Sequence, residues 1–260
     1  MKKLISRVIF SAFVALLIIS GCEQTYTQNV RTLAVGPDLG AEPSGYAAQA
    51  FEAAGGFDAW AKVKELQLNC VVSFYQPDGS YYLTQQRYEI FPWSNSIRIS
   101  SSEPQNTFIW QFTKGQFKVL KGGMRFNGLP EAVGSRYLAE LILNIVTSPV
   151  RFMDPSVEFS KEATPVKMYG QWYYLIDRKS KLNVASAERL SDAVFYQNRD
   201  TFVTDMIWFP RISAGRLLMV RGYDFERIEE DILIPTKIEI SRTDALGISQ
   251  ELLVKINVIL

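Results

Sequence analysis

Residues 66–75, Leu-Gln-Leu-Asn-Cys-Val-Val-Ser-Phe-Tyr, alternate between apolar side chains and side chains that are mostly polar. Successive side chains of a β-strand point to opposite faces, so a period of two predicts a strand with one buried face. The side chains expected on that face are Leu66, Leu68, Cys70, Val72 and Phe74. Pro77-Asp78-Gly79 follows and predicts a turn. The stretch therefore predicts the first strand of a sheet.

Strand-like runs of this kind occupy most of the remaining chain. They cover residues 81–91, 97–100, 107–113, 116–121, 157–159, 166–169, 172–177, 193–197, 202–209, 216–223, 237–241 and 252–258. Two turn sequences, Lys114-Gly115 and Asp244-Ala245-Leu246-Gly247, join neighbouring runs. The pattern predicts a large, mostly antiparallel sheet with few helices, which is a mainly β (α+β) fold.

One long helical pattern interrupts the strands, between Gly134 and Thr147. Its apolar stripe predicts a helix that covers one face of the sheet. The stripe consists of Tyr137, Leu138, Leu141, Ile142, Ile145 and Val146. Pro149 is expected to prevent the helix from continuing. Two shorter helical segments are expected before the first strand, over residues 44–54 and 57–63.

The first 22 residues decide where the protein is expected to reside. Positive charges near the start precede an apolar run from Val8 to Ile19, which is shorter than the roughly 20 residues that span a bilayer. This arrangement predicts a signal peptide over residues 1–21. Gly21 and Cys22 at its end resemble the lipobox of bacterial lipoproteins. The alternative is an ordinary cleaved signal in which Cys22 has no special role.

The lipobox resemblance implies that a diacylglyceryl thioether forms on Cys22 and that the lipid anchors the protein in the cell envelope, facing the periplasm. In the familiar sorting rule an Asp after the lipidated cysteine retains a lipoprotein at the inner membrane. Glu23 stands there instead, so the outer membrane is favoured over the inner one. Residues 22–43 are polar and rich in turn formers, which predicts a flexible tether. Residues 44–260 are expected to form one domain.

Composition excludes several classes of function. The chain has 28 Lys and Arg against 27 Asp and Glu, so its charge provides no electrostatic basis for binding nucleic acid. It has no histidine, which excludes mechanisms that need an imidazole. If Cys22 carries lipid, Cys70 has no cysteine partner, and neither a disulfide nor a cysteine metal site is expected. No cofactor is therefore expected besides the covalent lipid.

Three stretches resemble proteins with the fold of the lipoprotein carriers LolA and LolB. They are residues 53–60 with Val63 and Leu66, residues 150–155 with Val157, and residues 234–240. The similarity covers roughly residues 44–258. It implies an incompletely closed, strongly curved antiparallel sheet, an unclosed β-barrel, with helices that plug its concave side. It also implies a cavity between sheet and plug that binds acyl chains, lipopeptides or protein partners.

A curved sheet must fill its concave face with side chains or with a ligand, and only apolar walls would hold acyl chains. Three bulky rings share one face of the strand at 107–113, and the central helix adds apolar side chains. The candidates for cavity lining are Phe108, Trp110, Phe112, Leu141, Ile145, Trp172 and Trp208. For each of them the alternative is ordinary core packing.

We therefore expect a membrane-anchored periplasmic lipoprotein that binds a lipid, an acyl chain or a lipidated ligand, as a carrier or binding protein. The alternative is an envelope protein-interaction or stress-sensing module of the same fold. An enzyme is not expected, because no nucleophile, acid–base or metal constellation is recognised. The acidic pair Glu229 and Glu230, and Asp177 beside Arg178, are interpreted as charged turns and solvated strand ends.

Overall fold

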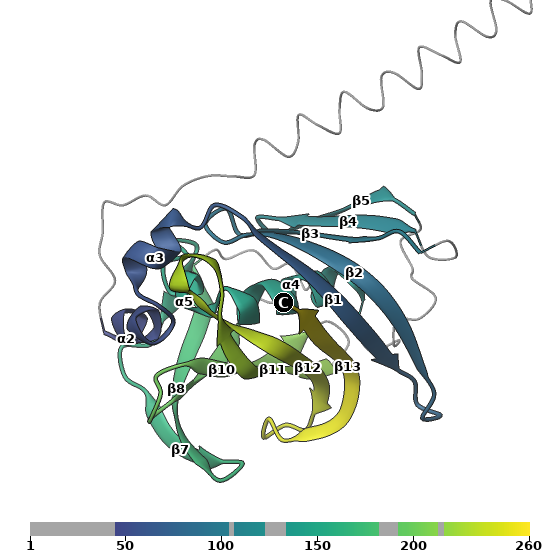
Figure 1. Ribbon diagram of the computed structural model, residues 1–260. Helices are drawn as coiled ribbons and strands as arrows, with labels where there is room; N and C mark the ends of the chain where they lie inside the picture. The colour runs from purple at the N-terminus through teal and green to yellow at the C-terminus, as the bar shows by residue number, and fades with distance from the viewer. Residues whose placement is uncertain (1–44, 104–106, 123–133, 182–191, 213–215) are drawn as a thin grey trace, which may run out of the picture. The chain divides into compact units, whose positions relative to one another are not determined.

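A thirteen-stranded antiparallel sheet dominates the part of the chain that the structure describes. The computed structural model describes residues 45–103, 107–122, 134–181, 192–212 and 216–260 (Figure 1). The predicted signal peptide (1–21), Cys22 and the predicted tether (22–43) lie outside the described residues.

The strands follow the period-two stretches closely, and every predicted strand overlaps one of the thirteen. Their bounds are β1 Leu66–Tyr75, β2 Tyr81–Phe91, β3 Ser96–Ser101, β4 Phe108–Thr113, β5 Gln116–Lys121, β6 Val157–Phe159, β7 Thr164–Met168, β8 Gln171–Ser180, β9 Ala193–Asn198, β10 Thr204–Ile212, β11 Arg216–Arg227, β12 Leu233–Thr243 and β13 Ser249–Ile259. The expected turns at 77–79, 114–115 and 244–247 connect β1 to β2, β4 to β5 and β12 to β13.

The strand order is β5-β4-β3-β2-β1-β13-β12-β11-β10-β9-β8-β6, with β7 paired to β8. The first and last strands of the domain meet in the middle of the sheet, where Val72 of β1 pairs with Ile256 of β13. The two ends of this order, β5 and β6, do not pair with each other. The sheet bends around its concave side without closing, as Figure 1 shows. This confirms the predicted curved, unclosed antiparallel sheet.

Helix α4 (Ser135–Val146) fills the concave side of the sheet (Figure 1). It contacts β3 and β4 from one half of the sheet and β10, β11 and β12 from the other. Its stripe of Leu138, Leu141, Ile142 and Ile145 is completely buried. Since α4 contacts strands of both halves, the core depends on this one helix.

Pro149 lies in a second helix that begins just after α4 ends. Helix α4 ends at Val146, and a second short helix, α5 (Ser148–Arg151), starts two residues later. Pro149 lies in the first turn of α5, where a proline costs no intrahelical hydrogen bond. The prediction that α4 would end before Pro149 is confirmed, but the additional turn of helix was not predicted. That turn carries Arg151 into the interior, as described below.

In the described part of the chain, the short helices α2 (Tyr46–Ala53) and α3 (Phe57–Lys62) precede the first strand, and a 3-10 turn, η2 (Glu229–Asp231), precedes β12. The carbonyl of Ala54 between α2 and α3 accepts hydrogen bonds from the backbone of Leu233 at 2.9 Å and from the indole of Trp60 at 3.0 Å. The indole of Trp93 in turn donates to the Trp60 carbonyl at 2.9 Å. These bonds hold the turn between β2 and β3 in place.

Side chains on both faces of the sheet are buried in its second half. The main core lies on the concave face, between the strands and α4. A smaller cluster lies on the opposite face, because alternate residues of β8, β9 and β10 point away from the main core. Its buried members are Tyr173, Tyr196, Met206 and Met219. Val166 and Met168 of β7 cover part of this outer cluster.

Candidate ligand-binding site

A cavity of about 480 Å³ lies where α5 meets the β2–β3 turn, the β4–β5 turn and strand β8. Its size is in the range of small-molecule binding sites, which is roughly 300–1,000 Å³. Helix α4 contributes Glu140 and Asn144 to the wall, and the segment after α5 contributes residues 153–157. Five separate parts of the chain therefore line one cavity at the edge of the core.

One side of the cavity is apolar. Its walls include Trp93, Phe112, Val150, Met153 and Val157. The Trp93 ring is held by its hydrogen bond to Trp60 and stacks on Phe51 at 6.3 Å between ring centroids. Phe112 and Val150 are almost fully buried, so this wall is continuous with the main core. Such a surface suits hydrocarbon.

The other side carries the guanidinium of Arg151, the last residue of α5. Only 3% of this residue is exposed. Its Nη2 donates a hydrogen bond to the Pro92 carbonyl, whereas Nε and Nη1 are buried without a hydrogen-bond partner among the described residues. Burial lowers the pKa of Arg151 to about 10, against the opposing effect of nearby Asp154. The group therefore remains charged at neutral pH.

A second guanidinium, that of Arg178 on β8, borders the same cavity and is also buried. Its Nη1 donates to Oδ1 of Asn144 at 2.5 Å, and its Cζ lies 5.4 Å from the ring centre of Phe195. Burial lowers the pKa of Arg178, while Glu140, Asp154 and Asp192 oppose that shift. An amide and an aromatic ring thus orient this cation.

The carboxylate of Asp154 at the rim has hydrogen bonds to both of its oxygens. Its Oδ2 accepts from the Asn95 amide at 3.1 Å. Its Oδ1 accepts from the backbone N–H of Ser156 at 2.9 Å and from the Ser156 hydroxyl at 2.6 Å. The described residues contain no group of three or more His, Cys, Asp or Glu that could hold a metal ion. The arrangement can bind a polar and an apolar group side by side.

Similarity to known proteins is found in the fold and not in the sequence. No protein-family model and no curated protein matches this sequence. Among solved structures, a LolA superfamily protein from Nitrosomonas europaea aligns with a TM-score of 0.53 at 14% sequence identity, over 83% of this chain and 92% of that chain. This chain has a LolA-like fold.

Two further solved structures align over similar lengths with lower scores. One is a DUF1329 family protein from Desulfovibrio piger, with a TM-score of 0.46, 13% identity, and coverage of 82% of this chain and 90% of that one. The other is a domain from Vibrio parahaemolyticus assigned to outer membrane lipoprotein sorting, with a TM-score of 0.43, 10% identity, and coverage of 82% and 91%.

The LolA-like architecture separates the seven residues that the sequence suggested for cavity lining. Phe112 borders the cavity described above. Phe108, Trp110, Leu141 and Ile145 are buried in the main core, where sheet and α4 pack directly against each other. Trp208 packs against the outer cluster on the opposite face, because it alternates with Ile207 and Phe209 along β10. Trp172 is 45% exposed.

Sequence reasoning missed the two buried arginines. Arg178 was interpreted as part of a solvated strand end, but it is buried, and only its neighbour Asp177 is exposed. The signal was present, since Arg178 stands two residues after Ile176 and therefore on the same, inward face of β8. For Arg151 the available signal was a lone cation among Val150, Phe152 and Met153.

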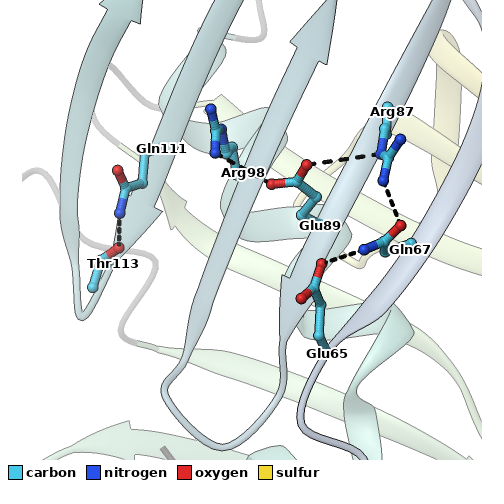
Figure 2. Close-up of polar contacts among 7 residues, drawn as sticks. All are labelled: Glu65, Gln67, Arg87, Glu89, Arg98, Gln111 and Thr113. Atoms are coloured by element: carbon cyan, nitrogen blue, oxygen red, sulfur yellow. Dashed lines mark hydrogen bonds and ion pairs between the residues drawn. The ribbon is translucent and has the colours of Figure 1, made fainter. Parts of the chain in front are cut away.

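Other polar residues of the LolA-like sheet satisfy one another on its outer face. Figure 2 shows a ladder across β1, β2 and β3 that starts at Glu65 and passes through Gln67, Arg87 and Glu89 to Arg98. Arg87 and Arg98 lie 3.7 Å and 3.4 Å from the Glu89 carboxylate. Because opposite charges alternate along the ladder, it has no excess charge with which to attract a ligand.

Cys70 lies on the inward face of β1 and is 1% exposed. Burial raises the pKa of its thiol to about 12, so the reactive thiolate is scarce at neutral pH. This confirms the predicted buried thiol. Within the described part of the chain, every helix falls short of the length and apolarity that a bilayer-spanning segment needs.

Proposed function

We propose that this protein is a lipid-anchored protein of the cell envelope that binds an acyl chain or a lipidated ligand on the concave side of its LolA-like sheet. It would act as a carrier or binding protein and not as a catalyst. The anchor would be the lipid on Cys22, and the outer membrane is the favoured location. The cavity between α5, α4 and the sheet is the observation that carries the proposal.

The shape of the cavity supports a ligand with a hydrocarbon part. Trp93, Phe112 and Val150 form an apolar wall that joins the main core, so methylene groups lying there would leave water. Each buried methylene contributes about 0.8 kcal/mol, and several of them together would produce measurable affinity. Beyond Phe112 the described side chains of α4 and the sheet pack directly against each other, so a guest in the cavity would not displace that helix.

Binding can be tested with a chain in which Cys22 is replaced by Ala, so that covalent lipid does not confuse the measurement. Native mass spectrometry should show copurified lipid, and unlabelled fatty acid should displace a fluorescent fatty acid. Val157→Trp should fill the cavity and abolish displacement. Val166→Trp, at a half-buried valine in the outer cluster, should leave displacement intact.

Absence of both copurified lipid and displacement in the otherwise unmutated chain would refute the proposal. If that chain instead crosslinked in cells to one dominant envelope protein, the alternative of a protein-interaction or stress-sensing module would take its place.

A further inference from the structure

The guanidinium of Arg151 has more hydrogen-bond donors in the interior than the protein satisfies. Only 3% of the residue is exposed. Its Nη2 donates one hydrogen bond, to the neutral carbonyl of Pro92. Among the described residues, Nε and Nη1 have no hydrogen-bond partner. An incompletely paired buried charge costs several kcal/mol, so natural proteins usually pair such groups or use them to bind a ligand.

Asp154, the acid that opposes the lowering of the Arg151 pKa, does not satisfy these donors. Asp154 influences the pKa of Arg151 through space, but both of its oxygens accept hydrogen bonds from Asn95 and Ser156. Its geometry is therefore fixed by groups other than Arg151. Arg151 is one of the residues that line the cavity, so its unsatisfied donors belong to a side chain of the cavity wall.

The cavity as a whole is also cationic. Its basic side chains are Lys114, Arg151 and Arg178, and its acidic ones are Glu140 and Asp154, which leaves one net positive charge. Arg178 is close enough to lower the pKa of Arg151 by charge repulsion. Two buried cations near each other repel, and an anion between or beside them would relieve that repulsion.

We propose that the ligand carries an acidic head group, a carboxylate or a phosphate, which accepts hydrogen bonds from Arg151 while its hydrocarbon lies against Trp93 and Phe112. The inference rests on the proposed function and adds the chemical class of the ligand: an anionic amphiphile. Asn144 holds the Arg178 guanidinium in place, so the second cation adds charge at a fixed position. Charge-assisted hydrogen bonds are roughly twice as strong as neutral ones, which would make the head group decisive for selection.

The test compares ligands that share one chain length and differ in the head group. Dodecanoate, dodecyl phosphate, dodecanol and inorganic phosphate are titrated by calorimetry into the Cys22→Ala protein. The two acidic amphiphiles should bind at least tenfold more tightly than dodecanol. Arg151→Met should remove that preference and Arg151→Lys should retain part of it, while Arg242→Met, at an exposed arginine paired with Glu251, should change nothing.

The outcomes separate the two proposals. Equal affinity for dodecanoate and dodecanol would overturn the acidic head group and leave acyl binding standing. Failure of every amphiphile to bind would overturn the proposed function itself. Inorganic phosphate binding as tightly as dodecyl phosphate would mean a free-anion site and would also overturn acyl binding. Because the ligand series is read on the chain with Arg151 intact, a variant that fails to fold does not prevent the decision.

Discussion

At the scale of single residues, a carboxylate in an unfavourable environment lies within hydrogen-bond distance of Tyr173 of the outer cluster. Oδ2 of Asp205 on β10 accepts a hydrogen bond from the Tyr173 hydroxyl at 3.3 Å, while Oδ1 is buried without a partner among the described residues. Burial raises the pKa of Asp205 to about 6, and the nearby Arg221 opposes the shift. The folded protein therefore holds a proton on Asp205 at pH values where the unfolded chain has released it.

This shift makes stability depend on pH. The pKa of an unfolded Asp is about 3.9, so the stability that Asp205 contributes by holding its proton is present below about pH 4 and is lost as pH rises towards 6. Asp205→Asn cannot ionise. We expect it to be more stable than the unmutated chain by about 1–3 kcal/mol at pH 7.5 and about equally stable at pH 4.

Urea unfolding at the two pH values measures this difference. Asp200→Asn, at an exposed position two residues after the end of β9, serves as the control and should shift neither curve. An Asp205→Asn effect of the same size at both pH values would show that ionisation is not its cause.

At the scale of elements, the junction between α2 and α3 depends on glycine. Gly55 has φ of +111°, and a Cβ built on it would lie 2.4 Å from the Asp231 carbonyl oxygen of η2. Gly56 has φ of +92°, but a Cβ there would meet nothing within 4 Å. At both positions a residue with a Cβ would have a strained backbone, but only at Gly55 would its Cβ also overlap a neighbouring backbone atom. This close approach lets Leu233 bond to Ala54 and brings Trp60 beside Trp93.

Replacing each glycine by alanine separates the two effects. Gly56→Ala should lower the free energy of unfolding by about 1–3 kcal/mol, the usual cost of placing a residue with a Cβ in a backbone conformation that is nearly restricted to glycine. Gly55→Ala should cost clearly more, because the new Cβ would overlap a backbone atom that cannot move without displacing η2. Chemical denaturation of both variants gives the comparison. Equal losses would mean that the junction adapts and that contact with η2 is unimportant.

At the scale of the whole molecule, the first and last strands of the domain pair with each other, and the sheet that they join curves around helix α4. Strands β1 and β13 pair in its centre, and α4 contacts both halves. The cavity lies at one end of α4 and takes its walls from both halves, with Phe112 from β4 and Arg178 from β8. The candidate site is therefore a property of the assembled sheet and not of any local segment.

The location of the whole molecule is tested at Cys22. Cells that express the full chain in the presence of labelled palmitate should incorporate label into this protein, because the residues around Gly21 and Cys22 resemble a lipobox. Cys22→Ser should abolish the label and release the protein from membranes into the soluble envelope fraction. Labelling that persists in Cys22→Ser would place the lipid elsewhere, and an unlabelled parent chain would mean an ordinary cleaved signal.

The sequence by itself determined the elements of the fold. Strands such as β1, β2 and β5 follow from side chains that alternate with period two, and α4 follows from its helical stripe, because both patterns record which local face is buried. The burial of Cys70 follows from the same alternation. The resemblance of three short stretches to LolA-like proteins supplied the curvature and the plug.

Only the tertiary structure decided which side chains meet. Trp110 and Ile145 belong to the main core and Trp208 packs against the outer cluster, although the LolA-like resemblance and the apolar side chains had suggested that all three line one cavity. Arg151 reaches the carbonyl of Pro92, and Arg178 reaches Asn144, across 59 and 34 positions of sequence. Local periodicity specifies the face of an element but not its partner, because partners are chosen by how the strands are ordered and how the helices pack against them.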